Sequence, residues 1–167
     1  WDLEDAVPAA QKETARETIR RQLEALPHDS PQVWVRINPI GAGQLEDDLG
    51  AIVQRGLRGA MLAKTESAEQ VDRLARSLEA REKSAGLELG SVKIHAILET
   101  AAGVCLAREI SGASNRVAGI SLGAEDFTLD LGTSRSKEGI ELAYARGAIV
   151  LAAAHARIEA VDTVFSD

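Results

Sequence analysis

The stretch VKIHAILETAAGVCLAREI, residues 92–110, contains the repeating unit of this chain. Residues 92–98 form an apolar run typical of a strand, and residues 101–110 form a helical stretch that ends at Gly112. The next apolar run, residues 117–122, follows at once. These runs are apolar on both alternating faces, which favours buried parallel strands over half-solvated antiparallel ones. The stretch therefore predicts a β-α-β unit.

The same alternation extends to both ends of the chain, with one strand and one helix in roughly every 30 residues. Predicted strands begin with a short run at Leu3 and continue at residues 33–37, 60–63, 92–98, 117–122 and 160–165. Predicted helices cover residues 8–26, 45–53, 68–78, 101–110 and 137–158. No linker interrupts this pattern. It predicts a single α/β domain over residues 1–167, with about six parallel strands.

The composition excludes several classes of protein. The chain has 19 Lys and Arg against 26 Asp and Glu, so its formal net charge is −7. Nucleic acids and anionic membranes both require a basic surface, so neither is expected as a partner. No apolar run reaches the roughly 18 residues that span a bilayer. A single cysteine, Cys105, excludes an internal disulfide and is typical of a reducing compartment, so we expect a cytoplasmic protein.

Two architectures are compatible with these strands, an open doubly wound sheet and a (β/α)8 barrel. A barrel needs about 250 residues, so length alone favours the open sheet. However, polar residues follow the carboxyl ends of most predicted strands, and a barrel collects its functional groups on the rim that these ends form. The chain also opens inside a pattern at WDLED and stops just after the run at 160–165, so we expect it to be part of a longer chain.

Two acidic residues are the sharpest candidates for chemistry. Glu99 and Asp126 each follow an apolar strand, and they lie 27 residues apart, which is one βα unit. Their carboxylates would therefore emerge from neighbouring strands at the same rim. Such a pair suits Mg²⁺, which takes one or two protein oxygens and completes its shell with water and substrate. The alternative is that both acids lie at helix N-termini for electrostatic reasons alone.

Arg36 is unusual because it interrupts the apolar strand VWVRI, residues 33–37. At a strand end, its planar fork could bind a substrate carboxylate or a developing enolate oxygen. The alternative is a structural ion pair with Asp2, Glu4 or Asp5.

Three further residues are weaker candidates. Lys64 follows a strand, but a solvated salt bridge accounts for it equally well. His95 is interpreted as a packed, hydrogen-bonded core residue, and Cys105 as a packing residue on its helix.

Five segments in register carry a family resemblance. They are DLEDAVP (residues 2–8, with Lys12 and Arg16), VRINP (35–39), LAKTESA (62–68), LETAAGV (98–104) and GAEDF (123–127). With these motifs, the chain resembles the citrate lyase β-subunit-like branch of the HpcH/HpaI aldolase superfamily. Two positions depart from the family pattern: Ala63 replaces the usual Pro before the Lys, and Ala102 often corresponds to Arg.

The resemblance implies a (β/α)8 TIM barrel, here a partial chain without the first strand and the C-terminal part. It implies a Mg²⁺-dependent carbon–carbon lyase that acts on a 3-hydroxyacyl-CoA thioester of the citryl-, malyl- or citramalyl-CoA type. Glu99 and Asp126 would bind the metal, Glu99 would also contact substrate, and Arg36 would be the catalytic, substrate-binding residue. A catalytic acid would come from the missing C-terminal region, and the protein would form homotrimers or hexamers.

Two other functions are compatible with the same residues. One is a class II pyruvate aldolase that acts on free 2-keto acids, and a basic CoA-binding surface near Arg58 or Lys64 would count against it. The other is a partner-dependent subunit of a lyase complex without activity of its own.

Overall fold

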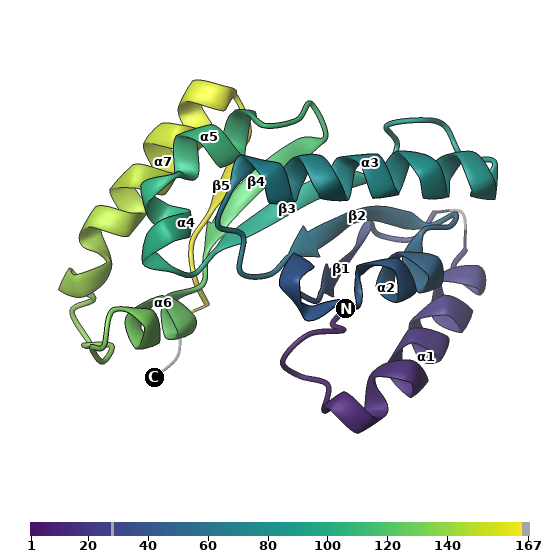
Figure 1. Cartoon of the computed structure of the whole chain (residues 1–167), viewed down its shortest axis with the longest axis horizontal. Helices are drawn as coiled ribbons and strands as arrows, with labels where there is room; N and C mark the ends of the chain where they lie inside the picture. The colour runs from purple at the N-terminus through teal and green to yellow at the C-terminus, as the bar shows by residue number, and fades with distance from the viewer. Residues whose placement is uncertain (28, 165–167) are drawn as a thin grey trace.

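The computed structural model describes residues 1–27 and 29–164 and has an α/β architecture built on a parallel sheet (Figure 1). The sheet has five strands in the order β1-β2-β3-β4-β5, which is also their order along the chain. They are β1 (Val33–Ile37), β2 (Leu57–Leu62), β3 (Lys93–Leu98), β4 (Val117–Leu122) and β5 (Glu159–Val161). All neighbours pair in parallel, which confirms the parallel sheet predicted from the apolar runs.

The short run at Leu3 lies beside β1. Asp2 forms a parallel bridge with Arg36, and the Leu3 N–H donates to the Arg36 carbonyl at 2.8 Å. The first residues of the chain therefore add one more parallel segment at the β1 edge. This bridge brings Asp2, Glu4 and Asp5 to the end of the sheet where the polar residues of the other strands collect.

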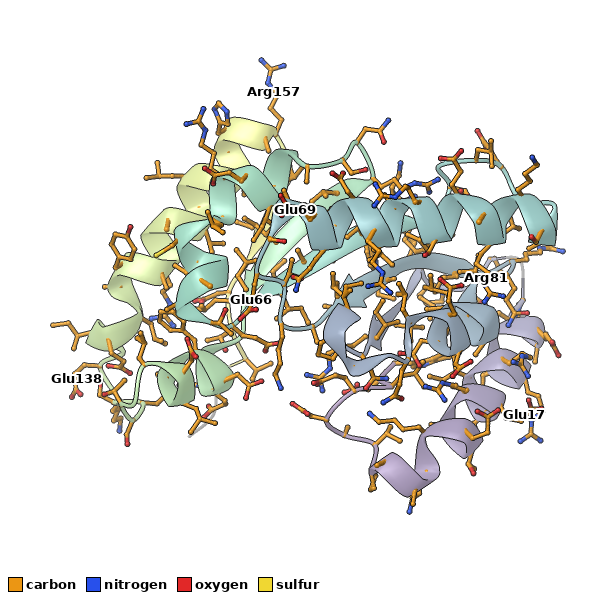
Figure 2. The ribbon with its side chains drawn as sticks, in the orientation of Figure 1. Glu17, Glu66, Glu69, Arg81, Glu138 and Arg157 are labelled. Atoms are coloured by element: carbon orange, nitrogen blue, oxygen red, sulfur yellow. The ribbon has the colours of Figure 1, made fainter. Side chains whose placement is uncertain are left out.

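Helices connect the strands and pack on the sheet. Their bounds are α1 (Lys12–Glu24), α2 (Leu45–Ile52), α3 (Ala68–Ala85), α4 (Ala101–Cys105), α5 (Ala107–Gly112), α6 (Ala124–Asp130) and α7 (Ala143–Ala156), with short 3-10 turns at Ala9–Gln11, Ile40–Ala42 and Ile140–Leu142. In Figure 1, α1, α2, α3, α5 and α7 lie around the outside of the sheet. Charged side chains such as Glu17, Glu138 and Arg157 project away from it (Figure 2).

One hydrophobic core lies between the sheet and these helices. Alternate strand residues, including Val35, Leu62, Ile94 and Ile120, are fully buried in it. The residues between them, such as Trp34, Met61 and His95, face a cavity on the other side of the sheet. The predicted inward positions of the last helix, Leu142, Ala145, Ile149 and Ala153, are all buried in the core.

Three predicted elements differ from the observed ones. The helix predicted at 101–110 is broken into α4 and α5, because the backbone of Leu106 leaves the helical region (φ −103°, ψ 17°). The helix predicted at 137–158 begins only at Ala143, because Gly139 adopts a left-handed conformation (φ 64°) that ends any regular run. The strand predicted at 160–165 is observed as Glu159–Val161, and residues 165–167 lie outside the described residues.

The remaining boundaries shift by a few residues. β2 begins at Leu57 rather than residue 60, and a 3-10 turn precedes α1. The helix predicted at 68–78 is longer than expected and continues to Ala85. In the described part of the chain, no helix combines the length and apolarity needed to cross a bilayer.

Candidate active site at the carboxyl ends of the strands

A cavity of about 660 Å³ opens on the side of the sheet that the helices leave uncovered. The three site residues predicted from the sequence, Arg36, Glu99 and Asp126, all line it. They come from β1, from the end of β3 and from the first turn of α6. The parallel topology therefore brings together side chains that are up to 90 residues apart in the sequence.

Glu99 is the most buried of these three residues, with 4% of its surface exposed. Its Oε1 accepts the backbone N–H of Lys64 at 2.7 Å. Its other oxygen lies against Gly123, where an added Cβ would be 2.3 Å from Oε2. Only glycine leaves room for the carboxylate there, so Gly123 is part of the site.

The environment of Glu99 changes its acidity. Burial raises its pKa to about 7, and the negative charges of Asp126 and Glu4 add to this increase. The hydrogen bond from the Lys64 N–H and the charge of Lys64 oppose it. Glu99 therefore titrates near neutral pH, and a cation beside it would favour its ionised form.

Asp126 lies within reach of a lysine. Its Oδ2 is 3.3 Å from Lys64 Nζ, and its side chain remains partly exposed to the cavity. Asp126 does occupy the first turn of α6, as the electrostatic alternative expects. Glu99 does not cap α4, because the N-cap is Thr100, whose hydroxyl accepts the Gly103 N–H at 3.1 Å. The electrostatic preference for acids in a first helical turn therefore accounts for the position of Asp126 but not for that of Glu99.

Arg36 is held by two carboxylates. Its Nε lies 3.1 Å from both oxygens of Asp2, a second nitrogen pairs with the same carboxylate, and Nη1 is 3.2 Å from Glu4 Oε2. The ion-pair alternative for Arg36 is therefore present in the structure. Among the described residues, these contacts occupy three of the five guanidinium N–H donors, which leaves one on each terminal nitrogen for a ligand.

Lys12 fixes the backbone of the first acidic segment of the chain, residues 2–5. Lys12 Nζ donates to the carbonyls of Leu3 and Glu4, at 2.6 and 2.8 Å, and to Asn38 Oδ1 at 2.8 Å. The Asn38 side chain donates to the fully buried Asp48 at 2.8 Å. This network holds the backbone of Glu4 in place.

Two residues, Glu4 and Lys64, are more central to the site than their sequence positions indicate. Glu4, 3% exposed, bridges the two cations of the site, because its oxygens lie 3.2 Å from Arg36 and 3.5 Å from Lys64. Lys64 contacts Asp5 and Asp126 as well, so it is not a simple solvated salt bridge. The signal in the sequence was the presence of both residues at strand ends, but the spacing alone did not pair them.

Two interpretations of single residues need correction. Buried His95 packs edge-on against Trp34, with ring centroids 6.1 Å apart, but its Nε2 has no hydrogen-bond partner among the described residues. Burial lowers the pKa of His95 to about 4, so the ring is neutral at neutral pH. Cys105 was expected to pack, yet it is exposed, because it lies at the end of α4 just before the helix breaks.

The donor set of the site is suited to a hard cation. Among the described residues, no group of three or more His, Cys, Asp or Glu side chains forms a ready-made metal cage. Glu99 and Asp126 instead offer two carboxylates beside an open cavity. Mg²⁺ is usually held by one or two carboxylates and keeps several waters, which substrate oxygens can replace. The residues present therefore fit this ion.

Comparison with known proteins identifies the family. All of residues 1–167 match the family described as HpcH/HpaI aldolase/citrate lyase. The chain is 40% identical to citrate lyase subunit beta of Haemophilus influenzae over 100% of this chain and 57% of that protein. It is 30% identical to human mitochondrial citramalyl-CoA lyase over 99% of this chain and 52% of that protein. The chain belongs to the HpcH/HpaI aldolase/citrate lyase family and spans about half the length of these relatives.

Solved structures agree with this assignment. The citrate lyase beta subunit from Mycobacterium tuberculosis, complexed with oxaloacetate and magnesium, superimposes with a TM-score of 0.79 at 35% identity, over 99% of this chain and 68% of that one. A complex of the CitE protein from the same organism with magnesium, acetoacetate and coenzyme A gives a TM-score of 0.76 at 34% identity, over 99% of this chain and 57% of that one.

Proposed function

We propose that this chain is part of a Mg²⁺-dependent carbon–carbon lyase that acts on a 3-hydroxyacyl-CoA thioester of the citryl-, malyl- or citramalyl-CoA type. The observation that carries the proposal is the convergence of Glu99, Asp126 and Arg36 on one cavity. Two carboxylates suit a magnesium ion, and a guanidinium with free donors suits a carboxylate or an enolate oxygen. Relatives named as lyases, and structures that contain magnesium and coenzyme A, support this choice.

We also propose that the sheet is part of a (β/α)8 barrel and that residues 1–167 belong to one barrel domain. The strands are parallel and neighbours in chain order, one face of the sheet packs in the helix-covered core, and the other face lines a cavity. These features are expected of a segment of a barrel wall. The polar residues collect at the carboxyl ends of the strands, which is the functional rim of this fold.

The residues of this chain would divide the work as follows. Glu99 and Asp126 hold the Mg²⁺ ion, which, when bound, lowers the cost of negative charge on a substrate oxygen. Arg36 binds the substrate carboxylate or the enolate oxygen through its two free N–H donors. Asp2 and Glu4 keep the guanidinium in place. As the family resemblance implies, the proton donor would be a residue of the full-length protein's C-terminal region, outside residues 1–167. The assembly would be a cytoplasmic homotrimer or hexamer.

The test is cleavage by the full-length protein of citryl-, malyl- and citramalyl-CoA and a free 4-hydroxy-2-keto acid, with and without EDTA. Cleavage of one thioester that EDTA abolishes is the expected result. Glu99→Gln and Asp126→Asn should both remove this activity, whereas Glu109→Gln, on the exposed face of α5, should retain it. Activity of both site variants at limiting Mg²⁺ would contradict the metal assignment.

One observation favours a class II pyruvate aldolase as the second candidate. The basic surface expected near Arg58 or Lys64 for coenzyme A is not formed by these residues. Arg58 lies near the amino end of β2, away from the rim, and Lys64 is paired with carboxylates. Cleavage of only the free keto acid would establish this alternative, and the absence of any cleavage would favour a partner-dependent subunit.

A further inference from the structure

Lys64 has an unusual backbone at the centre of the site. Its φ of 49° lies in the left-handed region that favours glycine, which is uncommon for a long side chain. In this conformation its N–H donates to Glu99 Oε1 at 2.7 Å, while its Nζ lies 3.3 Å from Asp126 Oδ2. A single residue therefore contacts both carboxylates of the proposed metal site. Such strained residues persist where the surrounding structure holds them, and they concentrate at functional sites.

The charges around Lys64 are unbalanced. We define the acidic cluster as Asp2, Glu4, Asp5, Glu99 and Asp126. Among the described residues, the side-chain cations in ion pairs with this cluster are Arg36 and Lys64. With every group ionised, the cluster and its two cations have a formal charge of −3. Arg36 is engaged by Asp2 and Glu4. Lys64 is therefore the cation that lies between Asp126 and the rest of the cluster.

The contacts of Lys64 argue against a role in binding a substrate anion. Its Nζ lies 3.3 Å from Asp126, 3.5 Å from Glu4 and 3.8 Å from Asp5. An ammonium group has three donors, and three carboxylates face them. A lysine side chain is ordinarily charged at neutral pH, and three neighbouring carboxylates favour that charged form.

We propose that Lys64 is the internal counter-cation of this site, which partly neutralises the acidic cluster before Mg²⁺ binds and releases Asp126 when it does. This inference rests on the proposed function. After release, Lys64 keeps Glu4 and Asp5 as partners, so its own charge stays paired. Because the ammonium and the metal ion repel each other, Lys64 lowers the affinity for Mg²⁺ and stabilises the metal-free site.

The experiment is calorimetric titration of MgCl₂, at low ionic strength, into the full-length wild-type protein and three variants. Lys64→Met removes the charge at similar length, Lys64→Arg keeps it, and Lys83→Met removes a charge on exposed α3, far from the cluster in the fold. A unit charge and Mg²⁺ about 6 Å apart repel enough, even at the dielectric constant of water, to change binding about tenfold. We therefore expect Lys64→Met to bind Mg²⁺ about tenfold more tightly and the other two variants to match wild type.

The melting temperature is a second measurement, which separates a loss of stability in Lys64→Met from a change in Mg²⁺ affinity. In EDTA, Lys64→Met should melt at a lower temperature than wild type, and Mg²⁺ should raise its melting temperature by more than it raises that of wild type. Lys64→Gln should change affinity in the same direction. Equal or weaker Mg²⁺ binding by Lys64→Met, with normal binding by wild type, would overturn the counter-cation role and leave the metal site intact. No binding by either protein would overturn the metal site itself.

Discussion

Gly123→Ala tests whether the end of β4 fixes Glu99 in its observed position. An added Cβ would lie 2.3 Å from Glu99 Oε2 and 2.6 Å from Glu99 Cβ. The second distance matters more, because rotating the carboxylate alone cannot relieve a clash with the Cβ atom. Either the backbone of Glu99 or the end of β4 has to move. The backbone of Gly123 itself, with φ −96°, allows alanine, so the effect comes from the clash.

Two effects of known size are expected. Overpacking of this kind costs about 1–3 kcal/mol in the free energy of unfolding. Displacing a ligand through its supporting residue lowers metal affinity by about 10–100-fold. Urea unfolding of the full-length protein in EDTA measures the first effect, and calorimetric titration of Mg²⁺ measures the second. Both effects should appear together, because one displacement causes both.

Gly147→Ala is the matched control. An added Cβ at Gly147, on the exposed side of α7, meets nothing within 4 Å. Alanine in a helix interior should stabilise the protein by about 0.5–1 kcal/mol and leave Mg²⁺ binding unchanged. If Gly123→Ala kept wild-type stability and wild-type Mg²⁺ affinity, the close approach of Gly123 to Glu99 would not be a constraint, and the description of the site would be wrong.

Three further predictions follow from the buried charges. The pKa of Glu99 is raised from 4.5 to about 7, so between these pH values the folded state holds a proton that the unfolded state has released. The free energy of unfolding in EDTA therefore falls as pH rises from 4.5 to about 7. Measured by urea unfolding relative to Glu99→Gln, this fall should reach up to about 3 kcal/mol. Arg116→Met leaves buried Glu82 without its ion-pair partner at 2.8 Å and should cost about 3–5 kcal/mol in the free energy of unfolding. Asp2→Asn loosens Arg36 and should raise KM for the cleaved thioester about tenfold, with a smaller change in kcat, in steady-state kinetics.

Each of these has its own control. A pH slope in Glu99→Gln equal to that of wild type would assign the titration to another group. Arg108→Met, on the exposed face of α5, should leave stability near the wild-type value, and an equal loss there would contradict the argument from burial. For Asp2→Asn, an unchanged KM with a reduced kcat would mean that Asp2 does not position Arg36 for substrate binding.

The strand pattern was the part of the fold that the sequence could predict. Runs such as 33–37 and 117–122 coincide with β1 and β4. Short, nearly continuous apolar runs are typical of parallel strands that are covered on both faces. Helix boundaries were less predictable. The break at Leu106 has no marker in its own residue type, and the stop at Gly139 depends on a backbone conformation that glycine permits but does not require.

The site was predictable in its members but not in its pairings. The positions of Arg36, Glu99 and Asp126 at one cavity follow from parallel topology, although their roles remain predictions. The contacts of Lys64 do not follow from the sequence, because its left-handed backbone directs the N–H and the side chain to two different carboxylates. Sequence spacing carries no information about such a conformation in a residue other than glycine.

The aromatic lining of the cavity has a practical consequence. The chain contains two tryptophans, Trp1 and Trp34, and both line the same cavity as Glu99 and Asp126. Their indole emission therefore reports on solvent exposure at the site. Trp34 also lies edge-on to His95. Entry of a ligand into this cavity is thus expected to change the emission of Trp1 and Trp34, without a label and without turnover, so an occupant can be sought before its reaction is known.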